Sequence, residues 1–334
     1  MSTQICKIAS DSSIIVLGAG TCSTVRCGVT NTATASCSAA LSGSLNNATN
    51  PGAVVAGGEC NNASGFYSTV AGGRLSTSSN YVSFIGGGIC NRATGFRSSI
   101  VAGIKNLNNS IDGFIGGGNC NNVCNVTNGC LSYGAVVAGG VGNNTTGGTW
   151  NLATCSFTVA PTICNAGAMS FVGGGFQNLA TGNCSAILGG CNNKTTGATS
   201  TVLGGNVNTS SAIYTITGGW NNTASNGLAV AIGQANTSSG NFAVAFGRNN
   251  ISSNTQTVVS GGYNNTASGY SSGVFGGESN IASCACAFIV GSNITSDRAC
   301  ATFVNNLSIK NIPTSSAGLP AGSVWRNGNV LNIV

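Results

Sequence analysis

Few residues of this chain could carry out acid–base, nucleophilic or metal chemistry. Its 334 residues include no histidine, so neither a Ser-His-Asp triad nor a Cys-His pair can form, and the commonest metal ligand is missing. The five carboxylates lie far apart in sequence and form no local acid–base pair: Asp11, Glu59, Asp112, Glu278 and Asp297. We therefore expect a protein that is not an enzyme, with no catalytic residue, no metal and no cofactor.

The sixteen cysteines are the remaining reactive side chains, and several are regularly spaced. Cys22 and Cys37 are 15 residues apart, and Cys286 and Cys300 are 14 apart, which is one repeat of the pattern described below. If successive repeats stack as neighbouring strands, their in-register Cα atoms lie about 4.8 Å apart. That separation permits a disulfide, so both pairs are disulfide candidates.

A second set of cysteines shares one repeat position but occurs in every other repeat. Cys60, Cys90 and Cys120 would lie about 9.6 Å apart, which is too far for a bridge within one chain. We expect them to be free thiols in the core or to bridge to other copies of the chain. A zinc site would need four thiolates here, and the densest cluster, which adds Cys124 and Cys130 to Cys120, supplies three.

The composition excludes several classes of protein. Charged residues make up 5% of the chain, against about 25% in typical globular domains. Hydrophobic residues make up 42% and the net charge is +6, which argues against disorder. The lysines and arginines form no cluster, so we expect no nucleic-acid partner. No apolar run is long enough to cross a membrane, so no membrane insertion is expected. The first ten residues also lack the pattern of a secretory signal peptide.

A repeat of 14 or 15 residues runs through most of the chain. Seventeen glycines that end short apolar runs, from Gly28 to Gly291, are separated by 14 or 15 residues in fourteen of sixteen intervals. Asn follows three residues later in fifteen of the seventeen repeats. The apolar runs alternate with period two and favour strands, while Gly and Asn favour turns with positive φ. The turn residues so predicted include Gly58, Asn61, Gly88, Asn91, Gly175, Asn178, Gly233 and Asn236.

Such a short unit holds two strands and two tight turns, which is one coil of a parallel β-solenoid. We expect an all-β left-handed β-roll, about 80 Å long if seventeen coils stack at 4.8 Å. Residues 1–20 would attach or cap it, 21–298 would form the array with insertions at 119–174, and 299–334 would form a C-terminal strand and hairpin. A second strand face of small residues would pack against other copies in a homotrimer, through Ala229, Ala231, Ala243 and Ala245.

The repeats carry a family resemblance, most closely between residues 200 and 291. The segments 228–233 (LAVAIG) and 241–247 (NFAVAFG) resemble the head repeats of YadA-like trimeric autotransporter adhesins. This resemblance implies a trimeric β-roll involved in adhesion. The chain shows neither a heptad stalk nor a membrane-anchor barrel, so it does not resemble a self-secreting adhesin as a whole.

The C-terminal segment resembles a different group of proteins. Residues 317–334 contain Asn327-Gly328 between two β-prone runs, which predicts a hairpin. The segment is similar to the short C-terminal tails of bacteriophage and large-virus fibre proteins. Together the two resemblances imply a structural fibre or tail appendage of a virus or bacteriophage, located on the virion surface or outside the cell. A cell-surface adhesin or extracellular filament subunit is the alternative.

The expected partners follow from this interpretation. They are two further copies of the chain, other virion proteins, and a glycan or protein on the host surface. Loops on a rigid scaffold often carry recognition, and the insertions hold three aromatic contact candidates: Tyr133, Trp150 and Phe157. A collar that only stabilises the rod is the other interpretation of these insertions.

Overall fold

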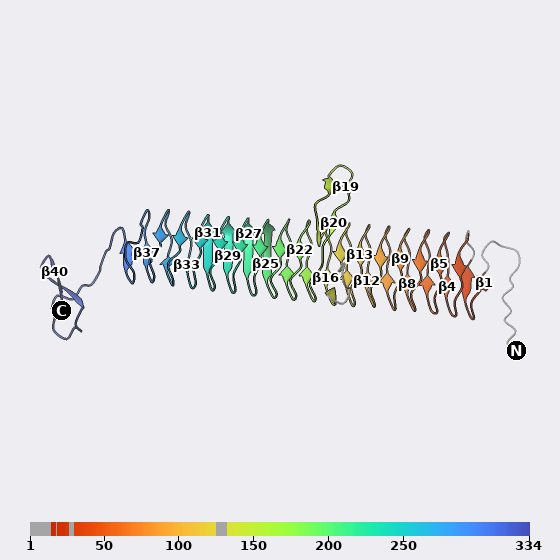
Figure 1. Cartoon of the computed structure of the whole chain (residues 1–334), viewed down its shortest axis with the longest axis horizontal. Coiled ribbons are helices and arrows are strands. Elements are labelled where there is room, and N and C mark those ends of the chain that lie inside the picture. Colours follow the sequence, from red (N-terminus) through yellow and green to blue (C-terminus); the bar gives the residue numbers. More distant parts are fainter. Residues whose placement is uncertain (1–14, 18, 27–29, 125–131) are drawn as a thin grey trace.

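The computed structural model describes residues 15–17, 19–26, 30–124 and 132–334, and the described part is all-β, without a helix. The chain forms a parallel β-solenoid of about 18 turns, drawn as a long rod in Figure 1. The predicted fold class is therefore confirmed. Within these residues no helix is long and apolar enough to span a membrane.

Each turn contributes one strand to a long sheet and one to a second sheet that is split in two. The long sheet has 19 strands. They are β1 (Ile15–Leu17), β2 (Thr24–Arg26), β4 (Ala39–Ala40), β6 (Val54–Val55), β8 (Thr69–Val70), β10 (Phe84–Ile85), β12 (Ser99–Ile100), β14 (Phe114–Ile115), β16 (Val136–Val137), β21 (Phe171–Val172), β23 (Ala186–Ile187), β25 (Thr201–Asn206), β27 (Ile216–Trp220), β29 (Val230–Gln234), β31 (Val244–Arg248), β33 (Val258–Val259), β35 (Gly273–Val274), β37 (Phe288–Val290) and β38 (Thr302–Val304).

The split sheet consists of a seven-stranded and an eight-stranded part. The first part holds β3 (Thr32–Ala33), β5 (Asn47–Ala48), β7 (Asn62–Ala63), β9 (Thr77–Ser78), β11 (Arg92–Ala93), β13 (Leu107–Asn108) and β15 (Asn122–Val123). The second holds β22 (Leu179–Ala180), β24 (Lys194–Thr195), β26 (Thr209–Ser210), β28 (Thr223–Ala224), β30 (Thr237–Ser238), β32 (Ile251–Ser252), β34 (Thr266–Ala267) and β36 (Ile281–Ala282).

Four short strands form an arm that projects from the rod, and two form a hairpin beyond its C-terminal end (Figure 1). The arm contains β17 (Thr145–Thr146), β18 (Thr149–Asn151), β19 (Ser156–Val159) and β20 (Thr162–Ile163). The hairpin consists of β39 (Val324–Asn327) and β40 (Val330–Ile333), with Gly328 at φ 60° in the predicted turn.

The boundaries differ from the prediction at the C-terminal end. The strand β38 was expected in a separate cap, but it pairs in parallel with β37 and adds the eighteenth turn to the array. At the other end β1 pairs antiparallel with β2 and covers the free edge of the first turn. Residues 1–14 and 18 of the N-terminal segment, the anchor Gly28 and Cys130 lie outside the described residues.

The core is a narrow seam of small and β-branched side chains between the two sheets. Val55, Ile85 and Ile100 from the long sheet are fully buried, as is Ala63 from the split sheet. Parallel pairing places these residues in register from turn to turn, as with Val55 and Val70. Each turn therefore buries its core side chains against the turns above and below it.

The small face expected to contact other copies lies inside the rod instead. The four alanines named for that role, Ala229, Ala231, Ala243 and Ala245, are all fully buried. Their larger neighbours point outward: Val230 and Ile232 are half-buried, and Phe246 is exposed. The same inward position holds a fully buried Ile187 or Val202 in other turns, so the alternation along the strand, and not side-chain size, decides which residue faces the core. The prediction that these alanines contact other copies was therefore wrong, although residues do alternate between the two faces of the strand as predicted.

The two predicted turn residues of each repeat have different roles. The glycines do have positive φ: 92° at Gly58, Gly88 and Gly175, and 124° at Gly233. A Cβ on Gly58 would lie 2.0 Å from the carbonyl oxygen of Gly73, so side chains are excluded there.

The asparagines do not have the predicted positive φ. That conformation belongs to the residue before each of them, namely Cys60, Cys90, Gln177 and Ala235, while Asn61, Asn91, Asn178 and Asn236 are fully buried. Their amides bind backbone groups of their own and the next turn. The Nδ2 of Asn91 donates to the carbonyls of Gly87 and Gly103, both at 2.8 Å, and its Oδ1 accepts the N–H of Asn106 at 3.0 Å. We call this column the asparagine ladder.

Candidate functional site: the arm and the edges of the rod

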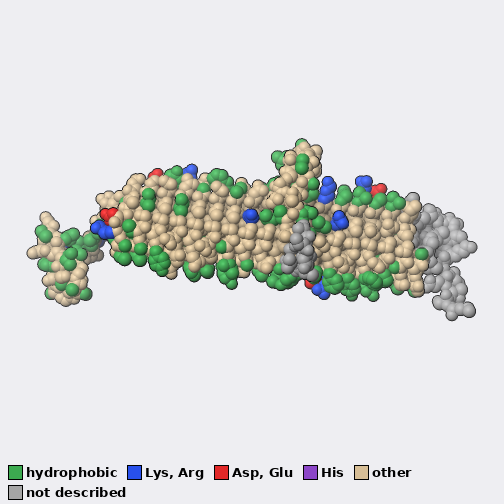
Figure 2. All heavy atoms as spheres, in the orientation of Figure 1, with side chains coloured by type: hydrophobic (Ala, Val, Ile, Leu, Met, Phe, Trp, Pro, Cys, Tyr) green, Lys and Arg blue, Asp and Glu red, His purple; other side chains and the backbone are tan. Residues whose placement is uncertain are grey.

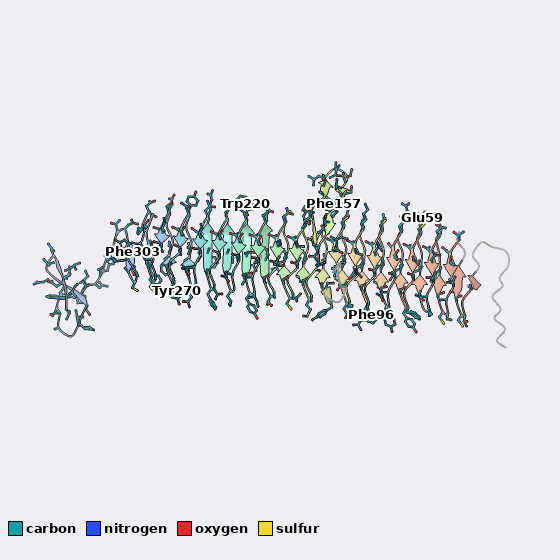
Figure 3. The ribbon with its side chains drawn as sticks, in the orientation of Figure 1. Glu59, Phe96, Phe157, Trp220, Tyr270 and Phe303 are labelled. Carbon is teal, nitrogen blue, oxygen red and sulfur yellow. The ribbon has the colours of Figure 1, made fainter. Side chains whose placement is uncertain are left out.

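The rod has two long edges, which the turns of each coil form. The arm edge comprises the loops that run from the long sheet to the split sheet, such as residues 56–61. The opposite edge comprises the loops that return to the long sheet, such as residues 64–68. Figure 3 shows Glu59, Phe157 and Trp220 toward one edge, and Phe96 and Tyr270 toward the other.

The arm leaves the rod after Asn144, where the split sheet is interrupted. Residues 145–165 extend outward, and Ala166 returns to the core, its N–H donating to the carbonyl of Cys124 at 2.8 Å. The asparagine ladder continues past the arm, because Asn143 binds Asn121 on one side and Asn178 on the other. The insertion therefore leaves the ladder intact.

The side chain of Asn144 bridges the gap in the split sheet. Its Nδ2 donates to the carbonyl of Asn122 in β15 at 3.0 Å, and its Oδ1 accepts the N–H of Ala180 in β22 at 2.9 Å. Backbone groups that a strand would have satisfied are thus bound by one buried amide. A consequence is that the arm projects from a closed rod rather than from a break in it.

Trp150 and Phe157 anchor the arm to the rod. Their ring centroids are 5.0 Å apart, and those of Trp150 and Phe157 lie 6.1 and 6.3 Å from that of Phe176 on the arm edge. Both arm residues are half-buried. The predicted contact residues are therefore used largely for packing within the chain, as the collar interpretation expects.

Most of the arm is exposed, and residues 151–155 form its tip. Figure 2 shows the arm standing out from the rod. Asn151 organises the tip turn, because its Oδ1 accepts the N–H groups of Ala153 and Thr154. Leu152 is 84% exposed, the highest value among the exposed large hydrophobic residues. The tip presents the apolar side chain of Leu152 and the single hydroxyl group of Thr154, with no charged group in residues 151–155.

A hollow lies on each flank of the arm, and each contains one lysine. Lys105, Cys120 and Ile163 are among the residues that line the first, of about 190 Å³. Lys194, Gln177 and Thr146 are among those that line the second, of about 220 Å³. Both hollows are partly open to solvent, and within the described residues no three His, Cys, Asp or Glu side chains come together to hold a metal ion.

The structure places Tyr133 away from the other two predicted contact residues. Its carbonyl accepts the N–H of Met169, just as that of Tyr81 accepts the N–H of Arg97, so it belongs to the opposite edge. Aromatic rings gather along that edge: Tyr81 stacks on Phe96 with centroids 5.1 Å apart. Tyr133 and the arm therefore do not form one site.

The disulfide candidates stand in register, as predicted, on the opposite edge. Thr24 pairs with Ala39 and Phe288 with Thr302, so Cys22 lies beside Cys37 and Cys286 beside Cys300. All four are free thiols in this structure, so their bonding stays a prediction. Desolvation raises the pKa of Cys286, and the adjacent Cys300 raises it further.

The second set of cysteines lies on the arm edge and not in the core. Cys60, Cys90 and Cys120 are half-buried, and each has a positive φ. Leu75 and Lys105 occupy the same position in the turns between them. The core alternative is therefore wrong for these three, and bridging to other copies stays untested. Burial raises the pKa of the Cys120 thiol, while nearby Lys105 lowers it by a smaller amount.

Comparison with known proteins adds no assignment. No protein-family model matches the chain, and no curated protein matches it. The candidate sites therefore depend on the geometry described above.

Proposed function

We propose that this chain is a homotrimeric structural fibre or tail appendage of a virus or bacteriophage, located on the virion surface and involved in host attachment. The observation that carries the proposal is the outer face of the long sheet. Two residues per turn point outward there, such as Val54 and Ala56, and from Ala39 to Val304 none of them is charged. The large exposed residues of this face are Leu41, Phe84, Val101, Phe114, Phe171, Leu188, Leu203, Ile216, Phe246, Phe275, Phe288, Val290 and Val304.

The size of this face favours an interface. Seventeen turns at about 4.8 Å, with two residue columns about 7 Å apart, make a strip of roughly 570 Å² before side-chain width is counted. Exposed apolar patches above a few hundred Å² usually mark interaction surfaces. The strip follows the rod axis, so copies that bury it would lie side by side as a fibre. If the copies are related by closed rotational symmetry around that axis, the apolar strip of every copy is buried.

The C-terminal hairpin supports assembly independently. Val330, Leu331 and Ile333 are exposed in the single chain. An isolated two-stranded hairpin is marginally stable in water, whereas three copies around one axis would cover these side chains. The number three and the viral origin come from the resemblances of the repeats and the tail. A cell-surface adhesin or extracellular filament subunit is the second candidate, which the adhesin-like repeats favour.

Immunogold electron microscopy tests the proposed location. Antibodies against the purified chain should label projections on particles from the source culture, and added soluble chain should reduce attachment of those particles to host cells. Labelling confined to cell envelopes would favour the adhesin alternative. Absence from both particles and envelopes would contradict both.

A further inference from the structure

The geometry points to a binding site for an extended neutral oligosaccharide on the arm edge between β25 and β36. The site is a ladder of outward side chains at one repeat position, paired in register from turn to turn. We call it the edge ladder. Its members are Asn206, Trp220, Gln234, Arg248, Tyr263 and Glu278.

Two aromatic residues provide platforms in this ladder. Trp220 is 49% exposed and Tyr263 is 41% exposed. In the described part of the chain Trp220 has no ring partner and no side-chain hydrogen bond, and Figure 3 shows it on the edge of the rod. Three turns separate the two rings, which corresponds to about 14 Å. The guanidinium of Arg248 lies 5.2 Å from the ring centroid of Tyr263, so it covers and orients one face of that ring.

Planar hydrogen-bonding groups lie beside these rings. Gln234 lies between Trp220 and Arg248 in the ladder, and its amide makes no hydrogen bond within the described residues. The neighbouring repeat position holds Asn221, Asn249 and Asn264, each at a φ near 55°. Amides both donate and accept, so this surface offers paired donors and acceptors next to flat apolar rings.

This combination suits a sugar chain better than a protein or a nucleic acid. One face of a pyranose ring carries C–H groups and packs on an aromatic ring, while the hydroxyl groups at its rim bind planar amides. The charges of Arg248 and Glu278 balance each other, so the ladder has no net attraction for a polyanion. The regular column also matches a repeating ligand laid along the rod.

The same column already binds aromatic rings of the chain itself. Phe176 occupies this repeat position two turns before Asn206, through Cys191. Trp150 and Phe157 of the arm cover Phe176. Aromatic side chains at this position thus accept a packed partner. Trp220 has no ring partner within the described residues, and Tyr263 has only Arg248 over one of its faces.

The part of the opposite edge around Tyr81, although aromatic, is a poorer sugar site. Tyr67, Tyr81 and Phe96 lie there in consecutive turns and pack on one another. Their faces are therefore occupied within the chain. A variant there provides a matched control, because it also removes one exposed aromatic ring from an edge.

A glycan array of neutral and acidic oligosaccharides, probed with the purified full-length chain, tests the inference. We expect binding to at least one neutral chain of glucose, mannose, galactose or N-acetylglucosamine. Trp220→Ala and Tyr263→Ala should each weaken it about tenfold or more, as hot-spot aromatics do. Tyr81→Ala should change it less than twofold. Thermal unfolding of each variant checks that the rod is intact.

Two results would overturn the inference: binding to acidic glycans alone or to none, and neutral-glycan binding that Trp220→Ala leaves unchanged. The inference deepens the proposed attachment function and rests on it for its biological role. The array uses only purified protein, so a failure of glycan binding is distinguishable from a failure to find the chain on particles.

Discussion

Replacing one residue of the asparagine ladder tests how the rod holds its turns together. In Asn91→Ala the N–H of Asn106 loses its side-chain acceptor and the carbonyl of Gly87 loses its donor. The carbonyl of Gly103 keeps the backbone N–H of Ile89 at 2.9 Å, so it stays bonded. Two polar groups are therefore left without partners, one of them in the fully buried seam.

The expected cost follows from those two groups. A buried polar group left without a partner costs about 1–3 kcal/mol. The Gly87 carbonyl is only half-buried and reaches water more easily, so the total is about 2–4 kcal/mol. Opening of the turns around Asn91 should become roughly 30- to 700-fold more frequent, at about 1.4 kcal/mol per factor of ten.

Hydrogen exchange followed by mass spectrometry measures this directly, because protection reports local opening in a repeat array. Peptides covering residues 76–108 should exchange faster in the variant, while peptides beyond residue 200 should not. The chain offers a reverse control. Ser76 occupies a position of the asparagine ladder, and its hydroxyl oxygen accepts the N–H of Asn91 in a long hydrogen bond of 3.4 Å. Because an asparagine there would provide a better acceptor, Ser76→Asn should slow exchange of the same peptides. An acceleration below threefold in Asn91→Ala, with no slowing in Ser76→Asn, would refute the reasoning.

Three further predictions concern assembly, the cysteines and the surface charges. Phe114→Glu on the outer face of the long sheet should give a folded monomer by sedimentation, whereas Ala231→Glu should fail to fold, because it buries an unpaired carboxylate. Under oxidising conditions, peptide mapping should recover Cys22–Cys37 and Cys286–Cys300, each stabilising the rod by about 3 kcal/mol; four free thiols would contradict this. The Arg97 guanidinium lowers the pKa of Asp112 below its usual 3.8. The ion pair therefore stabilises the folded chain slightly at pH values above the ordinary pKa of Asp112. This stabilisation is lost as the pH falls through the lowered pKa of the folded state. Thermal scans of Asp112→Asn should accordingly show a shallower acid limb than the unchanged chain.

The repeat length and the glycine positions were enough to predict the solenoid from sequence. A backbone that approaches its neighbour as closely as Gly58 approaches Gly73 requires glycine, and this requirement is visible as strict spacing. The role of Asn61 could not be read in the same way. Asparagine favours both positive φ and buried amide ladders, and only the three-dimensional register distinguishes the two.

The faces of the strands and the candidate sites were harder to predict. Alternation shows that Ala231 and Ile232 lie on opposite faces, but it does not show which of them faces the core, because the core position of Ala231 holds isoleucine in other turns, such as Ile187. Trp150 and Phe157 stand out in sequence because they interrupt the repeat, and the structure shows them packed on Phe176. Trp220 was missed because it lies within the repeat. A comparison of the residues at this one repeat position would have revealed Trp220 as a large aromatic residue between Asn206 and Gln234.

The mass of the purified chain in solution tests the central claim most directly. One chain has a mass of 32.7 kDa. Sedimentation equilibrium at low micromolar concentration should return three times that mass, and negative-stain images should show rods rather than globular particles. A single-chain mass that persists as the concentration rises would contradict the fibre, because the apolar outer face of the long sheet would then remain exposed to water.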